Sequence, residues 1–213
     1  MLETYPSAAA LADAAAHGIG ACLAQALRTR GRASLVATGG RSPGPVYDRL
    51  KDARLDWARV VITLSDERCV PVDHPDSNTR LLRERLPARA HIVPLTDEPA
   101  LSALAPFDAA MLGMGEDGHI ASLIPGDPGL EDALTTSDLT RPVPEGLGSP
   151  PLARITLTLS ALLQSRAIFL LIAGETKRQV LARAEAGEDL PVGRLIRQAK
   201  VPIRILWAPA HGG

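Results

Sequence analysis

The chain has 213 residues, a formal net charge of −1 at pH 7 and an aromatic content of only 3%. This length suits one domain with a sizeable core. The near-neutral charge argues against a surface that binds nucleic acid or anionic membranes, because such surfaces carry basic patches. The scarcity of aromatic residues also argues against platforms for base stacking.

Cysteine usage argues against the common metal and disulfide frameworks. The two cysteines, Cys22 and Cys69, form no C-x-x-C pair, and no Cys/His cluster has zinc spacing. We therefore expect no metal, no cofactor and a reducing, cytoplasmic setting. The first residues lack the basic and apolar regions of a signal peptide, and we expect no apolar run long enough to span a bilayer.

Helices and strands are predicted to alternate from the N-terminus. Ser7 is a suitable N-cap for a long helix over 8–30, rich in alanine and leucine, which Gly31 would end. An apolar strand is predicted over 34–37 and a helix over about 44–51.

A glycine loop joins that strand to that helix. Its residues are Thr38, Gly39, Gly40, Arg41 and Ser42, followed by Pro43. The backbone N–H groups of such a loop, together with the helix dipole, favour a bound phosphate. Because ordinary β–α turns also contain glycine, the loop alone is weak evidence for an anion site.

The next predicted strand, 60–64, ends in a polar segment that contains Asp66 and Arg68. Ser77 and Asn78 follow at the expected start of a helix that continues to position 85. Arg68 would suit a bidentate clamp on a phosphate. The alternative is a local Asp–Arg pair at the surface, which contributes little to stability.

The stretch over 107–126 is the most informative part of the sequence. Its apolar start predicts a buried strand, which ends at Gly113 and Gly115 before the charged turn Glu116-Asp117-Gly118-His119. Ligands of α/β sheets bind outside the carboxyl ends of the strands, and a histidine there can act as a general base near neutral pH. A lone Asp-Gly-His is more often a solvated turn, but its position between glycines after a buried strand favours a functional site.

The remaining segments continue the alternation of strands and helices. We expect one long loop over 127–151, strands over 91–95, 153–159, 167–173 and 203–207, and helices over 96–104, 174–186 and from 191. This order predicts an α/β fold with a doubly wound, mainly parallel sheet flanked by helices. Because no repeat or composition break marks a boundary, we expect a single domain over 1–213.

Two basic residues of the second half are candidates for anion binding. Arg154, in the strand predicted over 153–159, either faces the substrate or pairs with a carboxylate, and the sequence leaves both open. Lys177 lies just inside a helix that follows a strand, so it can reach an anion at the same edge of the sheet. On its own, a lysine at such a place is more often a solvated side chain.

Five ordered motifs over about 36–208 resemble those of the 6-phosphogluconolactonase family. The specific ones are Gly113-x-Gly115-x-Asp117-Gly118-His119-x-x-Ser122-Leu123-x-Pro125-Gly126 and Asp66-Glu67-Arg68-x-Val70-Pro71, the latter followed by Ser77-Asn78. The supporting ones are Gly39-Gly40-x-Ser42-Pro43, Arg154-Ile155-Thr156-Leu157-Thr158 and Gly174-x-x-Lys177. The resemblance implies a sheet of the sugar-phosphate isomerase and deaminase type.

The resemblance also implies hydrolysis of 6-phospho-D-glucono-1,5-lactone in the pentose phosphate pathway. His119 would then be the general base that activates water, and Asp117 would either orient its imidazole or stabilise its protonated form. Backbone N–H groups near Gly39, Gly40 or Gly115 are candidates for stabilising the oxyanion. Residues expected to bind the substrate and its phosphate are Gly39, Gly40, Arg41, Ser42, Asp66, Arg68, Ser77, Asn78, Gly113, Gly115, Gly118, Arg154 and Lys177.

Two other functions stay open at this stage. A glucosamine-6-phosphate deaminase would share the phosphate loop, but the Asp-Glu-Arg and Ser-Leu segments argue against it. A non-enzymatic sugar-phosphate sensor on the same fold would be expected to lack the base, yet His119 is present. The partner expected is a small sugar-phosphate lactone, and the sequence allows either a monomer or a homodimer.

Overall fold

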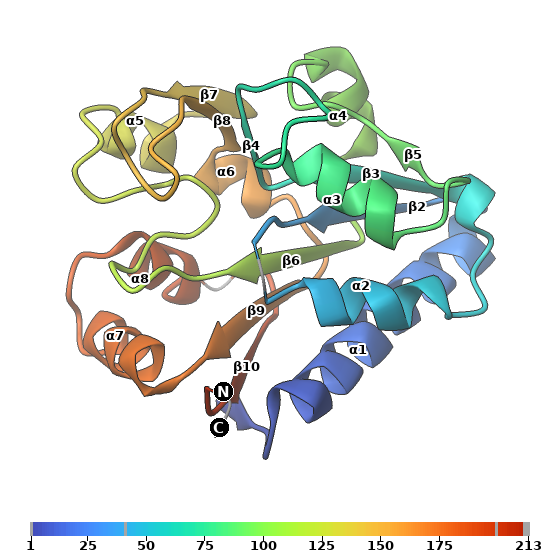
Figure 1. Cartoon of the computed structure of the whole chain (residues 1–213), viewed down its shortest axis with the longest axis horizontal. Helices are drawn as coiled ribbons and strands as arrows, with labels where there is room; N and C mark the ends of the chain where they lie inside the picture. Colours follow the sequence, from blue (N-terminus) through green and yellow to red (C-terminus); the bar gives the residue numbers. More distant parts are fainter. Residues whose placement is uncertain (1, 41, 199, 211–213) are drawn as a thin grey trace.

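The computed structural model describes residues 2–40, 42–198 and 200–210. Its larger sheet has seven strands, all parallel, in the order β1-β10-β9-β6-β2-β3-β5 (Figure 1). The strands are β1 (Leu2–Thr4), β2 (Ala33–Ala37), β3 (Val60–Leu64), β5 (His91–Ile92), β6 (Ala109–Gly113), β9 (Ile168–Ala173) and β10 (Ile203–Ala208). The α/β fold with a mainly parallel sheet is thereby confirmed.

The winding of this sheet reverses between β2 and β6. From β2 the chain moves outward to β3 and β5, then returns to place β6 on the other side of β2. It continues outward through β9 to β10. Such a reversal leaves a crevice at the carboxyl ends of the two central strands, which is where open α/β sheets bind ligands.

Helices cover the larger sheet and fill the connections between strands. They are α1 (Ala8–Arg30), α2 (Gly44–Lys51), α3 (Asn78–Arg85), α4 (Glu98–Leu104), α5 (Leu130–Thr135), α6 (Leu159–Leu162), α7 (Glu175–Glu185), α8 (Pro191–Ile196) and a 3-10 turn at Trp57–Arg59. The central strands are buried on both faces, as parallel strands between helices are. This burial explains their continuous apolar runs.

Helix α1 packs against β2, β6, β9 and β10. By length and composition alone α1 could cross a membrane, contrary to the expectation that no such run exists. In the fold its apolar face is buried instead, with Ile19 and Leu23 fully enclosed. Gly18 allows the close approach, since a Cβ there would lie 2.5 Å from a ring carbon of Phe169.

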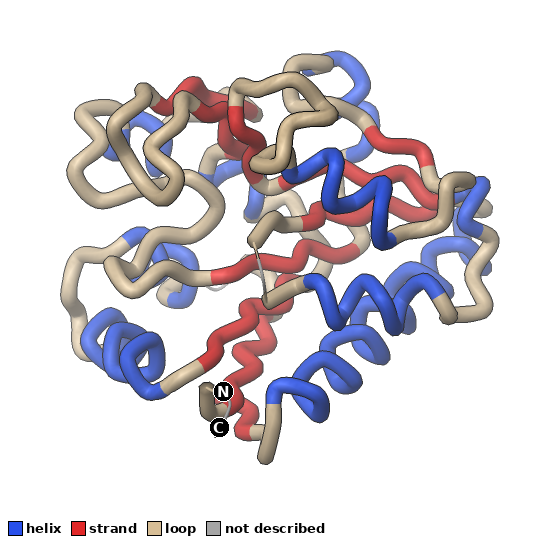
Figure 2. Tube along the Cα trace, in the orientation of Figure 1, coloured by secondary structure: helices blue, strands red, loops and turns tan. Residues whose placement is uncertain are grey.

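A second, smaller sheet stands beside the carboxyl edge of the first (Figure 2). It is antiparallel and has the order β4-β8-β7, with β4 (Asp66–Arg68), β8 (Arg154–Leu157) and β7 (Thr140–Val143). The chain enters it directly from β3 through Ser65, whose N–H donates to Ala37 in the larger sheet and whose carbonyl accepts from Leu157 in the smaller one.

Several predicted boundaries differ from the structure. The single long loop expected over 127–151 is wrong, because that segment contains α5 and β7. The strand expected over 153–159 ends at Leu157, where Thr158 begins α6 by accepting a hydrogen bond from Ala161 N. The strand expected over 91–95 is limited to the two residues of β5. Strands β1 and β4 were not predicted from the sequence. The single domain over 1–213 stays a prediction.

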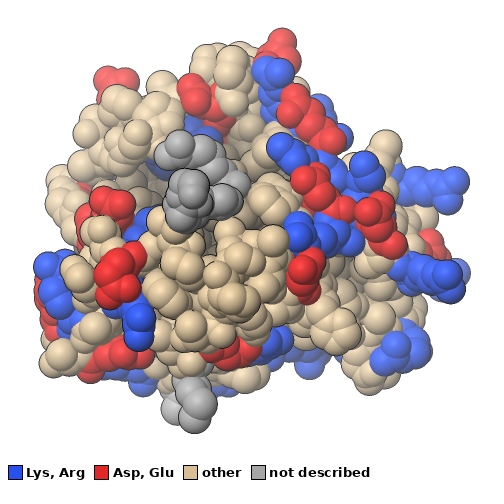
Figure 3. Space-filling model, turned by 60° about the horizontal axis from the view of Figure 1, so that its bottom comes forward, with Lys and Arg blue, Asp and Glu red and all other residues tan. Residues whose placement is uncertain are grey.

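The charge of the molecule is distributed without a dominant sign on the face drawn in Figure 3. Acidic and basic side chains are mixed around the rim of that face, and its centre is mostly uncharged. Many charged side chains of the described residues form ion pairs near the surface, such as Arg80 with Glu84 and Arg85 with Asp48. Exposed pairs of this kind contribute little to stability, so the fold depends mainly on its buried sheet.

Tyr47 on α2 connects that helix to the end of β2 through hydrogen bonds of its hydroxyl group. Removing the hydroxyl group tests how much these bonds stabilise the fold. Its buried hydroxyl accepts from Thr38 N at 2.9 Å and donates to Thr38 O at 2.5 Å, and burial raises the pKa of Tyr47. Tyr47→Phe should lower the free energy of unfolding by about 1–3 kcal/mol, because two buried backbone groups lose their partner. Denaturant unfolding measures this.

Tyr5→Phe provides the matched control for that measurement. The Tyr5 hydroxyl donates to Glu3 in a partly exposed position, where water can replace it. The control should therefore change the free energy of unfolding by no more than about 0.5 kcal/mol. An equal loss in both variants would contradict the role assigned to Tyr47.

Candidate active site

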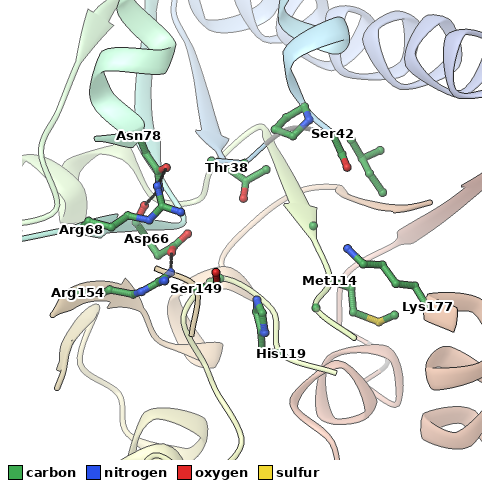
Figure 4. Close-up of a pocket in the computed structure, with 17 residues that line it drawn as sticks. Thr38, Ser42, Asp66, Arg68, Asn78, Met114, His119, Ser149, Arg154 and Lys177 are labelled. Atoms are coloured by element: carbon green, nitrogen blue, oxygen red, sulfur yellow. Dashed lines mark hydrogen bonds and ion pairs between the residues drawn. The ribbon is translucent and has the colours of Figure 1, made fainter. Parts of the chain in front are cut away.

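A cavity of about 280 Å³ opens where β2 and β6 end (Figure 4). It lies at the crevice that the reversal of winding creates. Its walls come from the loop after β2, the start of β4 and α3, the turn after β6, β8 and the first turn of α7. The predicted residues that line it are Gly39, Gly40, Ser42, Asp66, Arg68, Asn78, Gly113, Gly115, His119, Arg154 and Lys177.

His119 projects into the cavity (Figure 4). Its neighbour Asp117 holds the imidazole by a hydrogen bond. The Nδ1 atom of His119 lies 2.6 Å from Oδ1 of Asp117, and the same oxygen accepts from His119 N at 3.1 Å. Partial burial opposes ionisation of Asp117, but the side-chain and backbone hydrogen bonds and the charge interaction with His119 together outweigh it, so the pKa of Asp117 lies below its usual value. Asp117 itself does not line the cavity and acts on it through the imidazole.

Gly115 makes room for this pair, and other glycines shape the turn around it. A Cβ at Gly115 would lie 2.2 Å from Nδ1 of His119 and 2.4 Å from Oδ1 of Asp117, so only glycine fits beneath the two side chains. Gly118 has φ +83 and its Cβ position is 3.0 Å from Leu190, so it shapes the turn without lining the cavity. Gly113 borders the cavity in open space.

The glycine loop after β2 forms another wall. Thr38 is its first residue and is held by Tyr47, while Ser65 Oγ donates to Thr38 Oγ1 at 3.2 Å. A Cβ at Gly39 would lie 1.9 Å from Oδ1 of Asn78, so glycine lets the loop pack directly against the α3 residue. Arg41, which was also predicted to bind substrate, lies outside the described residues.

Arg68 is positioned by the start of α3. Its Nη1 donates to Asp76 O at 2.7 Å and to Asn78 Oδ1 at 2.8 Å, and Asn78 Nδ2 donates to Asp66 O at 2.8 Å. Ser77, predicted to bind substrate, instead caps α3 by accepting from Arg80 N and does not line the cavity. The amide of Asn78 therefore links Arg68 to the backbone of β4.

Arg154 and Asp66 resolve the alternatives left open by the sequence, because Arg154 both lines the cavity and pairs with a carboxylate. Its Nη1 lies 3.6 Å from Asp66 Oδ2, and only 5% of its side chain is exposed. Burial lowers the pKa of Arg154, while Asp66 opposes this shift. Asp66 also accepts from Ser122 Oγ at 2.6 Å and from Ser65 Oγ at 3.0 Å, so its carboxylate is fully engaged.

The charged residues of the cavity favour an anionic ligand. Of the described side chains that line it, Arg68, Arg154 and Lys177 are cationic and Asp66 is anionic. The Nε atoms of both arginines are buried without a hydrogen-bond partner among the described residues. Buried polar atoms nearly always have partners, so the described residues leave the donor capacity of these two guanidinium groups incompletely satisfied.

Lys177 lies on the opposite wall from the two arginines. In Figure 4 its ammonium group lies on the side of Ser42, whereas Arg68, Asn78 and Arg154 lie on the far side of His119. The first turn of α7 carries Lys177, and Trp207 Nε1 fixes the start of that helix by donating to Gly174 O at 2.9 Å. A ligand with two polar ends can thus contact cations on both sides of the imidazole.

The cavity is also lined by residues that were not among the expected substrate-binding residues: Thr38, Pro43, Met114, Ala121, Ser149 and Leu171. Thr38 and Met114 are adjacent to glycines that were predicted to bind substrate. Their position at the end of a strand could therefore have identified them as cavity residues. Ala121 has φ +50, an uncommon conformation for a residue other than glycine. Ser149 comes from a loop whose fold the sequence did not reveal, where Arg154 Nη2 donates to Pro150 O at 2.8 Å.

The described residues offer no evident metal centre, since no group of three or more His, Cys, Asp or Glu side chains among them is arranged to hold a metal ion. Asp66 and Asp117 each face cations or donors from the protein. What the site can do chemically is to bind an anion and to accept a proton at the imidazole.

Comparisons with known proteins agree with this geometry. The family model described as "Glucosamine-6-phosphate isomerases/6-phosphogluconolactonase" matches residues 6–207. A 6-phosphogluconolactonase of Rhizobium meliloti (strain 1021) is 39% identical over 98% of this chain and 98% of its own length. The crystal structure of a 6-phosphogluconolactonase from Shewanella baltica OS155 has a TM-score of 0.91 at 35% identity, covering 98% of this chain and 97% of its own.

A monomeric glucosamine-6-phosphate deaminase of the NagB superfamily is a more distant structural neighbour. It has a TM-score of 0.80 over 97% of this chain and 96% of its own, but only 19% identity, so the likeness concerns the fold alone. The match over nearly the whole length to a relative that is 39% identical is decisive. The chain therefore belongs to the family of glucosamine-6-phosphate isomerases and 6-phosphogluconolactonases, among its 6-phosphogluconolactonase members.

Proposed function

We propose that this chain hydrolyses 6-phospho-D-glucono-1,5-lactone to 6-phosphogluconate, as a cytoplasmic enzyme of the pentose phosphate pathway. The observation that carries the proposal is the Asp117-paired imidazole of His119 in one cavity with Arg68, Arg154 and Lys177. The relatives named 6-phosphogluconolactonase support the lactone as the substrate.

His119 is the general base in this proposal. When Nδ1–H donates to the Asp117 carboxylate, the lone pair of Nε2 is left to accept a proton from water. That water attacks C1 of the lactone, and the imidazolium then protonates the departing ring oxygen. A lactone carbonyl is electrophilic enough for activated water, so the proposal needs no covalent nucleophile and no metal.

Backbone N–H groups of the glycine loop stabilise the oxyanion that forms at C1. Of the three candidates, Gly115 N already donates to His119 O at 2.9 Å, which leaves Gly39 and Gly40. Their loop follows β2, the strand next to the one that ends in the His119 turn. Preorganised donors of this kind are commonly the largest single contribution to catalysis.

The cations bind the phosphate and thereby place C1 at His119. Arg68, Lys177 and the loop that ends at Ser42 are the proposed phosphate ligands, with Arg154 beside them. Because the reacting carbon is remote from the phosphate, this binding energy lowers the entropic part of the barrier by holding the ester against the base.

A direct assay separates this proposal from deamination. The protein should hydrolyse the lactone well above the spontaneous rate and should release no ammonia from glucosamine 6-phosphate at a comparable rate. The reason is that Asp66 is engaged with Arg154, Ser122 and Ser65, which leaves its carboxylate poorly placed to move protons of a substrate. Ammonia release that rivals lactone hydrolysis would replace the proposal with the deaminase alternative.

Two variants should separate the base from the phosphate ligands. His119→Asn should reduce kcat by roughly 10²–10⁴, the usual contribution of a positioned acid–base group, while calorimetric affinity for 6-phosphogluconate stays near that of the wild type. Lys177→Ala should mainly raise KM, because a charge that contacts ground state and transition state alike is lost. Near-wild-type kcat in His119→Asn would refute the assignment.

The pH dependence should also report on the pair of His119 and Asp117. Between about pH 5 and 8, kcat/KM should fall on the acid side through a single titration, because only a neutral imidazole accepts a proton. The lowered pKa of Asp117 means that its carboxylate stays charged through this range. Asp117→Asn removes that charge, so the acid limb should move to lower pH as kcat falls.

The spontaneous opening of the lactone, which is faster in base, must be subtracted at each pH in this experiment. Glu116→Gln is the matched control, because it neutralises the carboxylate next in the chain, outside the residues that line the cavity. A flat profile in the wild type, or an acid limb that Asp117→Asn leaves in place, would count against the histidine base.

A further inference from the structure

We propose that Glu67 is a positioning residue for substrate binding, acting through Asn78 and Arg68. Glu67 lies on β4 between Asp66 and Arg68, and alternation along the strand turns its side chain away from the cavity that its two neighbours line. The inference rests on the proposed function only in taking Arg68 as a substrate contact.

The Glu67 carboxylate holds the first residues of α3. Its Oε1 accepts from Asn78 N at 2.8 Å and from Arg68 N at 2.8 Å, and its Oε2 accepts from Thr79 N at 2.7 Å and from Ser77 Oγ at 3.2 Å. Four donors therefore converge on one half-buried anion at a helix N-terminus, where the helix dipole favours negative charge.

These bonds fix Asn78, whose side chain in turn fixes two walls of the cavity. Asn78 Oδ1 accepts from Arg68 Nη1 at 2.8 Å, while its backbone N–H is bound by Glu67. The same side chain fills the space where a Cβ of Gly39 would lie. A shift of Asn78 would therefore move both the guanidinium of Arg68 and the backbone of the glycine loop.

Capping of α3 does not by itself account for Glu67. Ser77 already caps the helix in the ordinary way, because its Oγ accepts from Arg80 N at 3.1 Å. Glu67 adds a second anchor that reaches both the backbone of Arg68 and the backbone of Asn78. Because Glu67 is bonded to the backbone of both β4 and α3, it can fix the angle between these two elements.

A double-mutant cycle distinguishes positioning from a purely structural role. Glu67→Ala and Arg68→Ala are made singly and together, and KM and kcat are measured on the lactone. Arg68→Ala should raise KM about 10- to 100-fold, the range of a lost charge-assisted contact. Glu67→Ala should raise KM about 10-fold with a smaller fall in kcat. Its effect on KM should shrink to about 2-fold when Arg68 is already alanine, because only the contribution of the glycine loop is then left.

Two further variants complete the design. Glu67→Gln keeps the shape and one acceptor, so its KM should lie between those of the wild type and Glu67→Ala, even if the alanine variant folds poorly. Asp97→Ala is the matched control, since Asp97 Oδ1 caps α4 by accepting from Ala100 N at 3.1 Å, away from the cavity. It should lower stability without changing KM.

The same four proteins are then titrated with inorganic phosphate in a calorimeter. This measures the effect of each substitution on anion affinity without the reaction. If the wild type failed to hydrolyse the lactone, the proposed function would fall, while the phosphate affinities would still decide the role of Glu67. The inference is overturned if Glu67→Ala leaves KM and phosphate affinity unchanged, if its effect is equally large in the Arg68→Ala background, or if Arg68→Ala itself has no effect.

Discussion

The reversal of strand order between β2 and β6 is the constraint on which the rest of the structure depends. Because all seven strands of the larger sheet are parallel, every loop at their carboxyl ends opens on one edge. The reversal means that no crossover helix covers the gap between the two central strands. The glycine loop after β2 and the turn that carries His119 after β6 therefore face the same cavity, although they are far apart in the sequence.

The smaller sheet closes the other side of that cavity and carries an electrostatic cost. Arg68 and Arg154 lie directly opposite each other on β4 and β8, and like charges in that arrangement destabilise a sheet. Asp66 and the amide of Asn78 partly offset this cost by pairing with the two guanidinium groups. A structure that retains two facing cations beside a cavity is already arranged for an anion, whose binding reduces the same repulsion.

The sequence predicted those parts of the molecule whose signals are local. The long helix after Ser7 and the helix after the glycine loop have the predicted bounds, because caps, glycine and proline act on their own neighbours. The antiparallel sheet was not predictable in this way, since Asp66–Arg68 is a strand only through pairing with β8, almost ninety residues later. Ser77 stands at the predicted start of a helix, but it does not line the cavity, and its hydrogen bond to Glu67 is evident only once β4 and α3 are placed.

The fold alone does not decide between ester hydrolysis and deamination, because a deaminase shares it at 19% identity. In the proposed function, the two reactions are distinguished by how the side chains of the site are engaged. Asp66 is bound by Ser65, Ser122 and Arg154, so its charge serves to hold the wall of the cavity. Within the part of the chain that the structure describes, His119 has a hydrogen-bond partner on one ring nitrogen only, and any side chain at position 115 would displace its imidazole. A site with one oriented imidazole and a restrained carboxylate is suited to a reaction that needs a single proton acceptor, which is what the attack of water on a lactone requires.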